Sequence, residues 1–267
     1  MLDTITDIVS DIIEDTAQEC ILPYFRHLKA GDITTKKSPN DYVTVADIKA
    51  EQYLSQRLKK LVPGSVVLGE EAAFKNPKVF ESLCYPDTTV WIIDPLDGTK
   101  NFIKGQSIFG IIVSMVINGE TVAGWINIPL HKNVMIAGEK GSGVWSQGIK
   151  LCTTSFNKEL CRMKGSLSIE IPSLNEKIRS KLWWGSAAFS YAMLLTRNIH
   201  FAIYRTHPLQ PWDHAAGVFL HKEAGGVSGF IDGSQYRPFP IDSTLILAPD
   251  EEIWQELAHT VKADAAS

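Results

Sequence analysis

The first part of the chain alternates hydrophobic and polar positions with a helical period. Hydrophobic side chains recur every three or four residues from Leu2 to Leu28, which predicts one long packing helix. A polar connection follows at residues 31–40, and Thr44 can cap a second helix that carries Asp47 in its first turn. We therefore expect two helices that pack through one apolar face each, with Asp47 beside a helix N-terminus.

Short apolar runs bounded by turn residues predict strands after the second helix. One run leads into Glu70 and another into Asp94, so two strands are expected to end at acidic residues. Three later runs predict an antiparallel meander. The segment Gly138–Gly143 lacks the Gly-Lys-Ser/Thr of a phosphate-binding loop, so we expect a hairpin turn there. The predicted strands are Ser65–Leu68, Thr88–Ile93, Phe109–Ile117, Thr121–Ile128 and Val134–Ala137.

Helices and strands alternate again in the second half of the chain. The stretch Lys150–Trp184 has weak periodicity, and we expect one short helix near Asn175–Lys181. We expect a single unit with two approximate halves, residues 1–150 and 151–267. The later pattern predicts helices at Ala187–Arg197, Trp212–Ala224 and Glu251–Val261 and strands at His200–Tyr204 and Thr244–Ala248.

Charge and composition narrow the classes of ligand. The 267 residues carry a formal net charge of -4 and a pI near 6.0, so the basic footprint of a direct nucleic-acid binder is missing. No run approaches the roughly 20 apolar residues of a membrane span, and the N-terminal residues are acidic and amphipathic. We therefore expect a cytoplasmic protein without membrane association. The four cysteines are widely spaced, and we expect reduced, mostly buried thiols.

The segment Trp91–Gly105 carries the clearest chemical signal. An apolar strand runs into Asp94, Pro95 is expected to force a turn, and Asp97-Gly98-Thr99 is typical of the start of a short helix. This order places two carboxylates, a backbone carbonyl and several free N–H groups close together. Mg²⁺ prefers oxygen ligands, and the N–H groups that open a helix favour phosphate oxygens. One turn could therefore hold both metal ions and a substrate phosphate.

Asp94 and Asp97 could instead be an ordinary turn and cap pair, as most Asp-Pro and Asp-Gly sequences are. Two further acids favour the metal interpretation. Glu70 follows a predicted strand, and Asp213 opens a predicted apolar helix. Together the four supply the carboxylates that a site with several Mg²⁺ ions needs.

Four ordered motifs resemble those of the inositol monophosphatase family of Mg²⁺-dependent phosphatases, and in particular its bacterial members, which include the extragenic suppressor proteins. They span nearly the whole chain. The motifs are Asp41–Asp47, Gly69–Glu71, Trp91–Gly105 and Trp212–Gly226. The resemblance implies an α+β fold that forms a five-layer α-β-α-β-α sandwich of the sugar-phosphatase type, and it implies a homodimer.

The resemblance also implies roles for individual residues. Two or three Mg²⁺ ions would bind, and Li⁺ would inhibit by occupying a Mg²⁺ position. The implied metal ligands are the side chains of Glu70, Asp94, Asp97 and Asp213 and the carbonyl oxygen of Leu96. The implied catalytic residues, which would orient the attacking water, are Glu70, Thr99 and Asp47. The implied substrate contacts are Asp97, Gly98, Thr99, Ser186, Ala187 and Asp213.

Several of these positions also have a purely structural interpretation. Asp47 would stabilise a helix start without any catalysis, and Ser186 and Ala187 could simply open a helix. Other expectations are structural throughout: a packing role for Trp212, a solvated position for Glu71, and a solvated loop for Lys36 and Lys37.

The substrate is less closely defined than the chemistry. Family members that favour inositol phosphates place a glutamate after the strand that precedes the Trp-Asp motif, whereas this chain has Tyr204-Arg205-Thr206-His207 there. Such a change alters which hydroxyls or charges the pocket satisfies. Inositol 1-phosphate is the leading small phosphorylated metabolite, and histidinol phosphate, fructose 1,6-bisphosphate and a 3'-phosphonucleotide remain open. An alternative of another class is a protein partner in an RNA or transcription complex.

Overall fold

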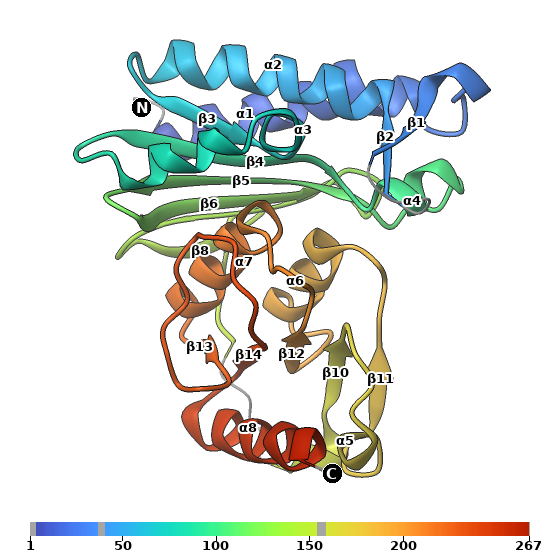
Figure 1. Cartoon of the computed structure of the whole chain (residues 1–267), viewed down its shortest axis with the longest axis vertical. Coiled ribbons are helices and arrows are strands. Elements are labelled where there is room, and N and C mark those ends of the chain that lie inside the picture. The colour runs from blue at the N-terminus through green and yellow to red at the C-terminus, as the bar shows by residue number, and fades with distance from the viewer. Residues whose placement is uncertain (1–3, 37–40, 154–158, 267) are drawn as a thin grey trace.

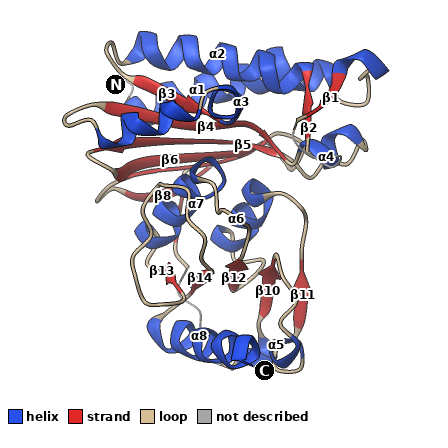
Figure 2. Ribbon diagram, viewed as in Figure 1, coloured by secondary structure: helices blue, strands red, loops and turns tan. Residues whose placement is uncertain are grey.

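The chain folds into five stacked layers. The computed structural model describes residues 4–36, 41–153 and 159–266. Helices α1 and α2 cover one face of a seven-stranded sheet, α6 and α7 lie between this sheet and a five-stranded one, and α5 and α8 cover the far face (Figure 1). Figure 2 shows the same alternation of helices and strands by colour. The predicted α-β-α-β-α sandwich is confirmed.

The outer helical layer begins with a shorter helix than the sequence predicts. Helix α1 (Ile5–Thr16) continues as one π-helical turn, η1 (Ala17–Ile21), and ends in a 3-10 turn at Leu22–Tyr24. Pro23 explains the early end, because a proline donates no backbone hydrogen bond and its ring displaces the preceding turn. Helix α2 (Val45–Leu61) starts at Thr44 as predicted.

The seven-stranded sheet contains the predicted meander. Its strand order is β3-β4-β5-β6-β7-β8-β9, and every pair is antiparallel except β3 with β4. The turn expected at Gly138–Gly143 joins β7 to β8. The strands are β3 (Val66–Gly69), β4 (Thr89–Asp97), β5 (Gly110–Ile117), β6 (Glu120–Ile128), β7 (Val134–Glu139), β8 (Gly143–Ser146) and β9 (Ile149–Leu151). A small separate sheet pairs β1 (Ile33–Thr35) with β2 (Tyr42–Thr44).

The second half supplies the middle helices and the other sheet. The five-stranded sheet has the order β11-β10-β12-β14-β13. The expected helix at Asn175–Lys181 was wrong, because Pro172 starts helix α5 earlier and the following residues pair beside β10 as β11. The helices of the second half are α5 (Pro172–Asn175), α6 (Ala187–Leu195), α7 (Pro211–Glu223) and α8 (Glu251–Ala266), and the first half adds the short helices α3 (Glu70–Lys75) and α4 (Thr99–Ile103). The strands are β10 (Lys164–Leu167), β11 (Ser180–Leu182), β12 (Phe201–Tyr204), β13 (Val227–Phe230) and β14 (Leu245–Ala248).

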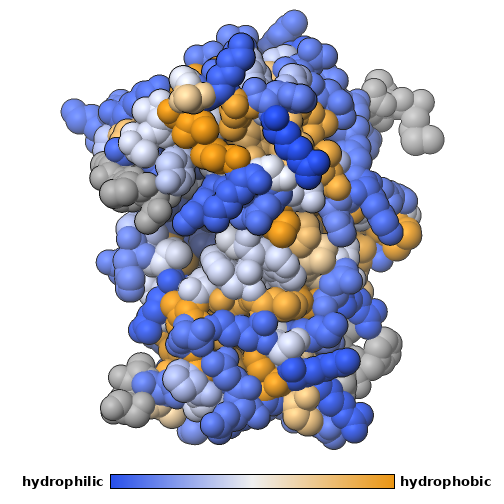
Figure 3. All heavy atoms as spheres, turned by 90° about the vertical axis from the view of Figure 1, so that its right-hand side faces the viewer, coloured by the Kyte–Doolittle hydropathy of each residue, from blue (hydrophilic) through white to orange (hydrophobic). Residues whose placement is uncertain are grey.

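The surface is mainly polar. Hydrophilic residues cover most of the face in Figure 3, and hydrophobic residues interrupt them in separate areas over the upper layers and across the lower half. Among the described residues, none of the helices combines the length and the apolar character needed to cross a membrane. The expectation of mostly buried thiols was wrong: Cys20 is buried, whereas Cys84, Cys152 and Cys161 are exposed. Cys84 and Cys161 lie in 3-10 helices, and Cys152 directly follows the short strand β9.

Candidate active site

Three aspartates from two layers meet at one point. Asp94 and Asp97 come from the end of β4, and Asp213 comes from the first turn of α7. One carboxylate oxygen from each lies within 4.8 Å of the other two. Oxygen atoms at this spacing suit a shared hard cation such as Mg²⁺. The two layers thus each supply part of one candidate metal site.

A bulge in β4 places Asp94 and Asp97 on the same side. The strand continues through Pro95 instead of turning there, and its pairing with β5 shifts between the two aspartates. The N–H of Leu96 donates to Asp94 Oδ1 over 3.0 Å, which fixes the bulge. The turn predicted at Pro95 was therefore wrong, because β5 still pairs with Asp97.

The short helix that follows needs glycine at its N-cap, Gly98. Gly98 has a φ of +89°, a conformation that side chains disfavour, and a Cβ there would come within 2.9 Å of the Ile108 carbonyl oxygen. Helix α4 starts directly after it at Thr99, as the sequence predicts. The N–H groups of Gly98 and Thr99 thus open a helix next to the aspartates.

The start of α6 holds the Asp97 carboxylate. The N–H of Ala187 donates to Asp97 Oδ1 over 3.1 Å, and that of Ala188 donates to Asp97 Oδ2 over 2.8 Å. The Ser186 hydroxyl also donates to Asp97 Oδ2. The Ser186 hydroxyl and the Ala187 N–H thus donate their hydrogen bonds to Asp97. A direct contact between these residues and a substrate stays a prediction.

The carboxylates raise one another's affinity for protons. Burial raises the pKa of Asp94 well above its ordinary value, and the negative charges of Glu70 and Asp97 raise it further. The pKa of Asp213 rises from burial and from the charge of Asp97. Burial also raises the pKa of Asp97 to about 6, against the hydrogen bonds from α6. Such a cluster of buried acids is stable in its charged form when a cation neutralises it.

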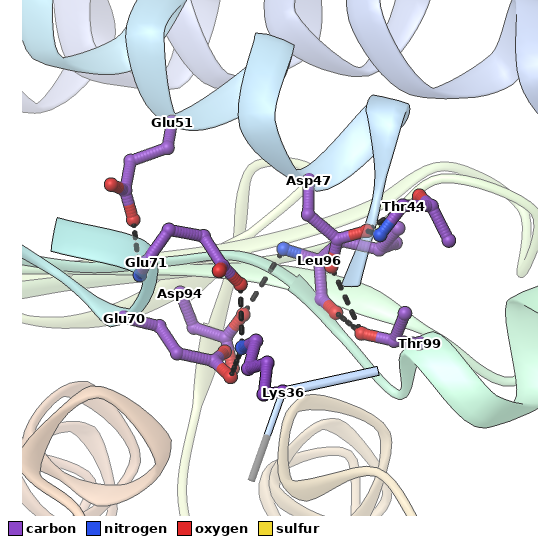
Figure 4. A network of polar contacts seen from close by, with 9 residues as sticks. All are labelled: Lys36, Thr44, Asp47, Glu51, Glu70, Glu71, Asp94, Leu96 and Thr99. Atoms are coloured by element: carbon purple, nitrogen blue, oxygen red, sulfur yellow. Dashed lines mark hydrogen bonds and ion pairs between the residues drawn. The ribbon is translucent and has the colours of Figure 1, made fainter. Parts of the chain in front are cut away.

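Lys36 lies against the cluster, contrary to the sequence-based expectation. Its Nζ is 2.5 Å from Glu70 Oε1 and 2.6 Å from Glu71 Oε1, and its side chain is only 4% exposed (Figure 4). Burial lowers the pKa of Lys36, but the two carboxylates outweigh it and the net shift is upward. The solvated loop predicted for Lys36 was wrong, and Lys37 lies outside the described residues.

Glu71 is also buried, not solvated as predicted. Its backbone N–H donates to Glu51 Oε2 over 2.8 Å, and burial raises the pKa of its side chain to about 7. Glu70, its neighbour, starts α3 directly after β3. The β1–β2 hairpin brings Lys36 to this pair, and three-residue strands leave too short a pattern in the sequence to reveal it.

The buried Asp47 and the half-buried Thr99 form a pair on the other side of the cluster. Thr99 Oγ1 lies 2.9 Å from Asp47 Oδ1 and 3.0 Å from the Leu96 carbonyl oxygen (Figure 4). The N–H and hydroxyl of Thr44 hold Asp47 Oδ2 over 2.8 and 2.5 Å. Burial raises the pKa of Asp47 to about 6, against the hydrogen bonds from Thr44. Asp47 therefore completes the capping box of α2, and its role in proton transfer stays a prediction.

Comparisons with known proteins identify the fold family. A model described as the inositol monophosphatase family matches residues 1–265. The chain belongs to this family. The family predicted from the four motifs is thereby confirmed. Because the chain belongs to this family, it is a phosphatase, and the family is metal-dependent in general.

Two curated relatives in this family carry inositol phosphatase names. The inositol-1-monophosphatase of Bacillus subtilis is 31% identical over 243 residues, which cover 86% of this chain and 88% of that protein. A Thermotoga maritima protein described as fructose-1,6-bisphosphatase/inositol-1-monophosphatase is 29% identical, with 79% and 80% covered.

Solved structures in the family share the fold. A Thermotoga maritima IMPase superimposes with a TM-score of 0.83 at 26% identity, with 97% of each chain covered. The extragenic suppressor protein suhB of Bartonella henselae gives a TM-score of 0.78 at 23% identity, with 96% of this chain and 97% of that chain covered. The second likeness concerns the fold alone.

Proposed function

We propose that the protein hydrolyses a small phosphate monoester with the help of Mg²⁺, and that inositol 1-phosphate is the first candidate substrate. One observation carries the proposal: carboxylate oxygens of the buried Asp94 and Asp97 and of the half-buried Asp213 lie within 4.8 Å of one another. Burial first, and then the charges of neighbouring acids, raise the pKa values of these carboxyl groups, and a divalent cation would offset the negative charge that they carry when ionised. The names of the curated relatives support the choice of substrate.

The residues present fit Mg²⁺. The donor set consists of carboxylates and a carbonyl, without a cysteine or histidine ligand, and it suits a hard cation better than zinc. The proposed ligands are the side chains of Glu70, Asp94, Asp97 and Asp213 and the carbonyl oxygen of Leu96. When bound, Mg²⁺ would acidify water and neutralise charge on the phosphate. Family membership also leads us to propose that Li⁺ inhibits.

The chain's own groups account for binding and proton transfer. The N–H groups of Gly98 and Thr99 would donate to the phosphate oxygens at the start of α4. As water attacks phosphorus, the Thr99 hydroxyl would take its proton and pass its own to Asp47, which lies 2.9 Å away. A pKa near 6 lets Asp47 accept a proton close to neutral pH. The phosphorus–oxygen ester bond breaks, and the alcohol leaves with a proton from solvent.

Phosphate release tests the proposal directly. Purified protein is incubated with inositol 1-phosphate in Mg²⁺ or in EDTA, beside the variants Asp94→Asn and Asp11→Asn. Asp11 is an exposed acid on α1 and serves as the control for loss of one charge. We expect Mg²⁺-dependent release by the wild type and by Asp11→Asn, and near-complete loss in Asp94→Asn. Equal release by Asp94→Asn, or release unchanged by EDTA, would contradict the metal mechanism.

We also propose a homodimer. Trp145 and Ile149 are 45% and 67% exposed on β8 and β9, which end one side of the seven-stranded sheet, and they offer apolar contact area. Light scattering after gel filtration gives the test: a mass near 59 kDa is expected, twice the 29.6 kDa of the chain. A single 29.6 kDa species at micromolar concentration would contradict it.

A further inference from the structure

A pocket opens beside the carboxylate cluster. It has a volume of about 480 Å³, and its lining includes Asp213 of the cluster and the neighbouring Glu70. The rest of its lining comes from the segment before α2, from α3 and the 3-10 helix at Pro77–Cys84, from the chain before α7 and its first turn, and from Pro240. Sites of roughly 300–1,000 Å³ hold whole small molecules, so this space exceeds what a phosphate group needs.

One wall of the pocket is aromatic. The rings of Phe80 and Trp212 stack with their centroids 6.0 Å apart and an interplanar angle of 23°. Phe74 also lines the pocket and is 37% exposed. Stacked rings at a fixed angle offer a flat apolar surface, and a planar ring makes the largest contact with such a surface. Trp212 therefore packs against Phe80, as predicted, and also forms part of the pocket wall.

The polar groups of the pocket favour hydrogen-bond donors. Gln210 lines the pocket, and its Oε1 is buried without a hydrogen-bond partner in the described part of the chain. Asp41 adds a second acceptor to the lining. The positive charge of Lys36 is already paired with Glu70 and Glu71. A ligand with N–H donors would satisfy these acceptors, whereas a second anionic group would be repelled by the carboxylates of the lining, Asp41 among them.

We propose that this pocket binds the alcohol portion of the substrate, and that this portion carries a planar heteroaromatic ring with N–H donors. The ring would stack on Phe80 and Trp212 while the phosphate lies at the carboxylate cluster. The inference rests on the proposed hydrolysis and concerns only which alcohol is released. Inositol 1-phosphate, the first candidate on the names of the relatives, is a saturated cyclic ester, and the pocket ranks monophosphates of alcohols with a planar ring above it and above bisphosphates.

A substrate series tests the ring preference. The value of kcat/KM is measured for benzyl phosphate and cyclohexylmethyl phosphate, which have similar size and differ in planarity. Histidinol phosphate adds N–H donors, inositol 1-phosphate adds hydroxyls, and fructose 1,6-bisphosphate adds a second anion. We expect benzyl phosphate to exceed cyclohexylmethyl phosphate by about 10-fold, because one ring stacked on an aromatic side chain contributes on that order. Histidinol phosphate should exceed benzyl phosphate, and the bisphosphate should be the poorest substrate.

Variants assign the preference to this pocket. Phe80→Leu keeps an apolar side chain but removes the ring, and it should bring the ratio of benzyl to cyclohexylmethyl phosphate close to one. Phe74→Leu should lower the same ratio. Because Phe74 is more exposed than Phe80, this variant keeps the test possible if Phe80→Leu does not fold. Gln210→Leu should lower the advantage of histidinol phosphate over benzyl phosphate. Tyr85→Leu is the control, since Tyr85 is 49% exposed and does not line the pocket.

The outcomes separate this inference from the proposed function. Mg²⁺-dependent release from every ester without a ring preference would overturn the pocket assignment and leave the hydrolysis intact. A ring preference that survives both Phe80→Leu and Phe74→Leu would also overturn it. Release from none of the esters would contradict the proposed function itself.

Discussion

Replacing Asp94 with asparagine should stabilise the metal-free protein while abolishing turnover. Two charges 4.8 Å apart, the largest separation in the triad, repel by about 3.5 kcal/mol at an effective dielectric constant of 20. Protonation relieves part of this repulsion, so we expect a net gain of about 1–3 kcal/mol at pH 7.5. Asparagine keeps an Oδ1 that can still accept the N–H of Leu96, so the bulge in β4 remains.

Thermal unfolding in EDTA and in Mg²⁺ measures this effect. In EDTA the Asp94→Asn variant should melt higher than the wild type, by about 2–4 °C for each kcal/mol. In Mg²⁺ the order should reverse, because a ligand at 100 times its Kd stabilises the wild type by about 2.7 kcal/mol and the variant has lost a ligand. A variant that melts lower than the wild type in EDTA would refute the repulsion on which the candidate site depends.

Three further predictions concern pH, packing and the proton path. The folded-state pKa of Asp97, about 6, is higher than its ordinary value of 3.8; its stabilising contribution is therefore present below pH 3.8 and lost as the pH rises through 6. The melting temperature in EDTA should accordingly fall between about pH 4 and pH 6, and saturating Mg²⁺ should remove that fall. Gly217→Ala should destabilise the protein by about 1–3 kcal/mol in urea unfolding, because its Cβ would lie 2.4 Å from the Tyr191 ring. Gly31→Ala is the control, since nothing lies within 4 Å of its Cβ, and equal stability of the two variants would be inconsistent with the packing. Thr99→Val should lower kcat by about 10²- to 10⁴-fold, whereas Thr99→Ser should retain most of it. Equal rates for these two variants would exclude the hydroxyl from proton transfer.

Much of the candidate site could be predicted because its acids stand at the ends of clearly patterned elements. Asp94 follows an apolar run, Glu70 follows another, and Asp213 opens a helix, and the structure brings these elements to one place. The meander and the long helices could be predicted from their strong periodicity, whereas the five layers were predicted from the resemblance to the family. Motif order then linked the chain to a family whose fold the structure shares.

What the sequence could not reveal depends on contacts between distant segments. Lys36 lies in a polar stretch without periodicity, and its burial follows only from its pairing with Glu70 and Glu71. Strand β11 likewise forms because β10 pairs beside it in parallel, not because Ser180–Leu182 has a strand pattern. The bulge at Pro95 depends on β5 as a partner. Local propensity decides little where tertiary pairing dominates.

The carboxylate cluster combines residues that lie far apart in the sequence. Asp94 and Asp97 belong to the sheet formed by the first half, whereas Asp213 and the groups that grip Asp97 belong to helices of the second half. A cation bound to these three carboxylates would link the first half of the chain to the second. Divalent ions should therefore favour the association of the two halves late in folding. When these ions are removed, the contacts between the two halves should weaken before either sheet unfolds.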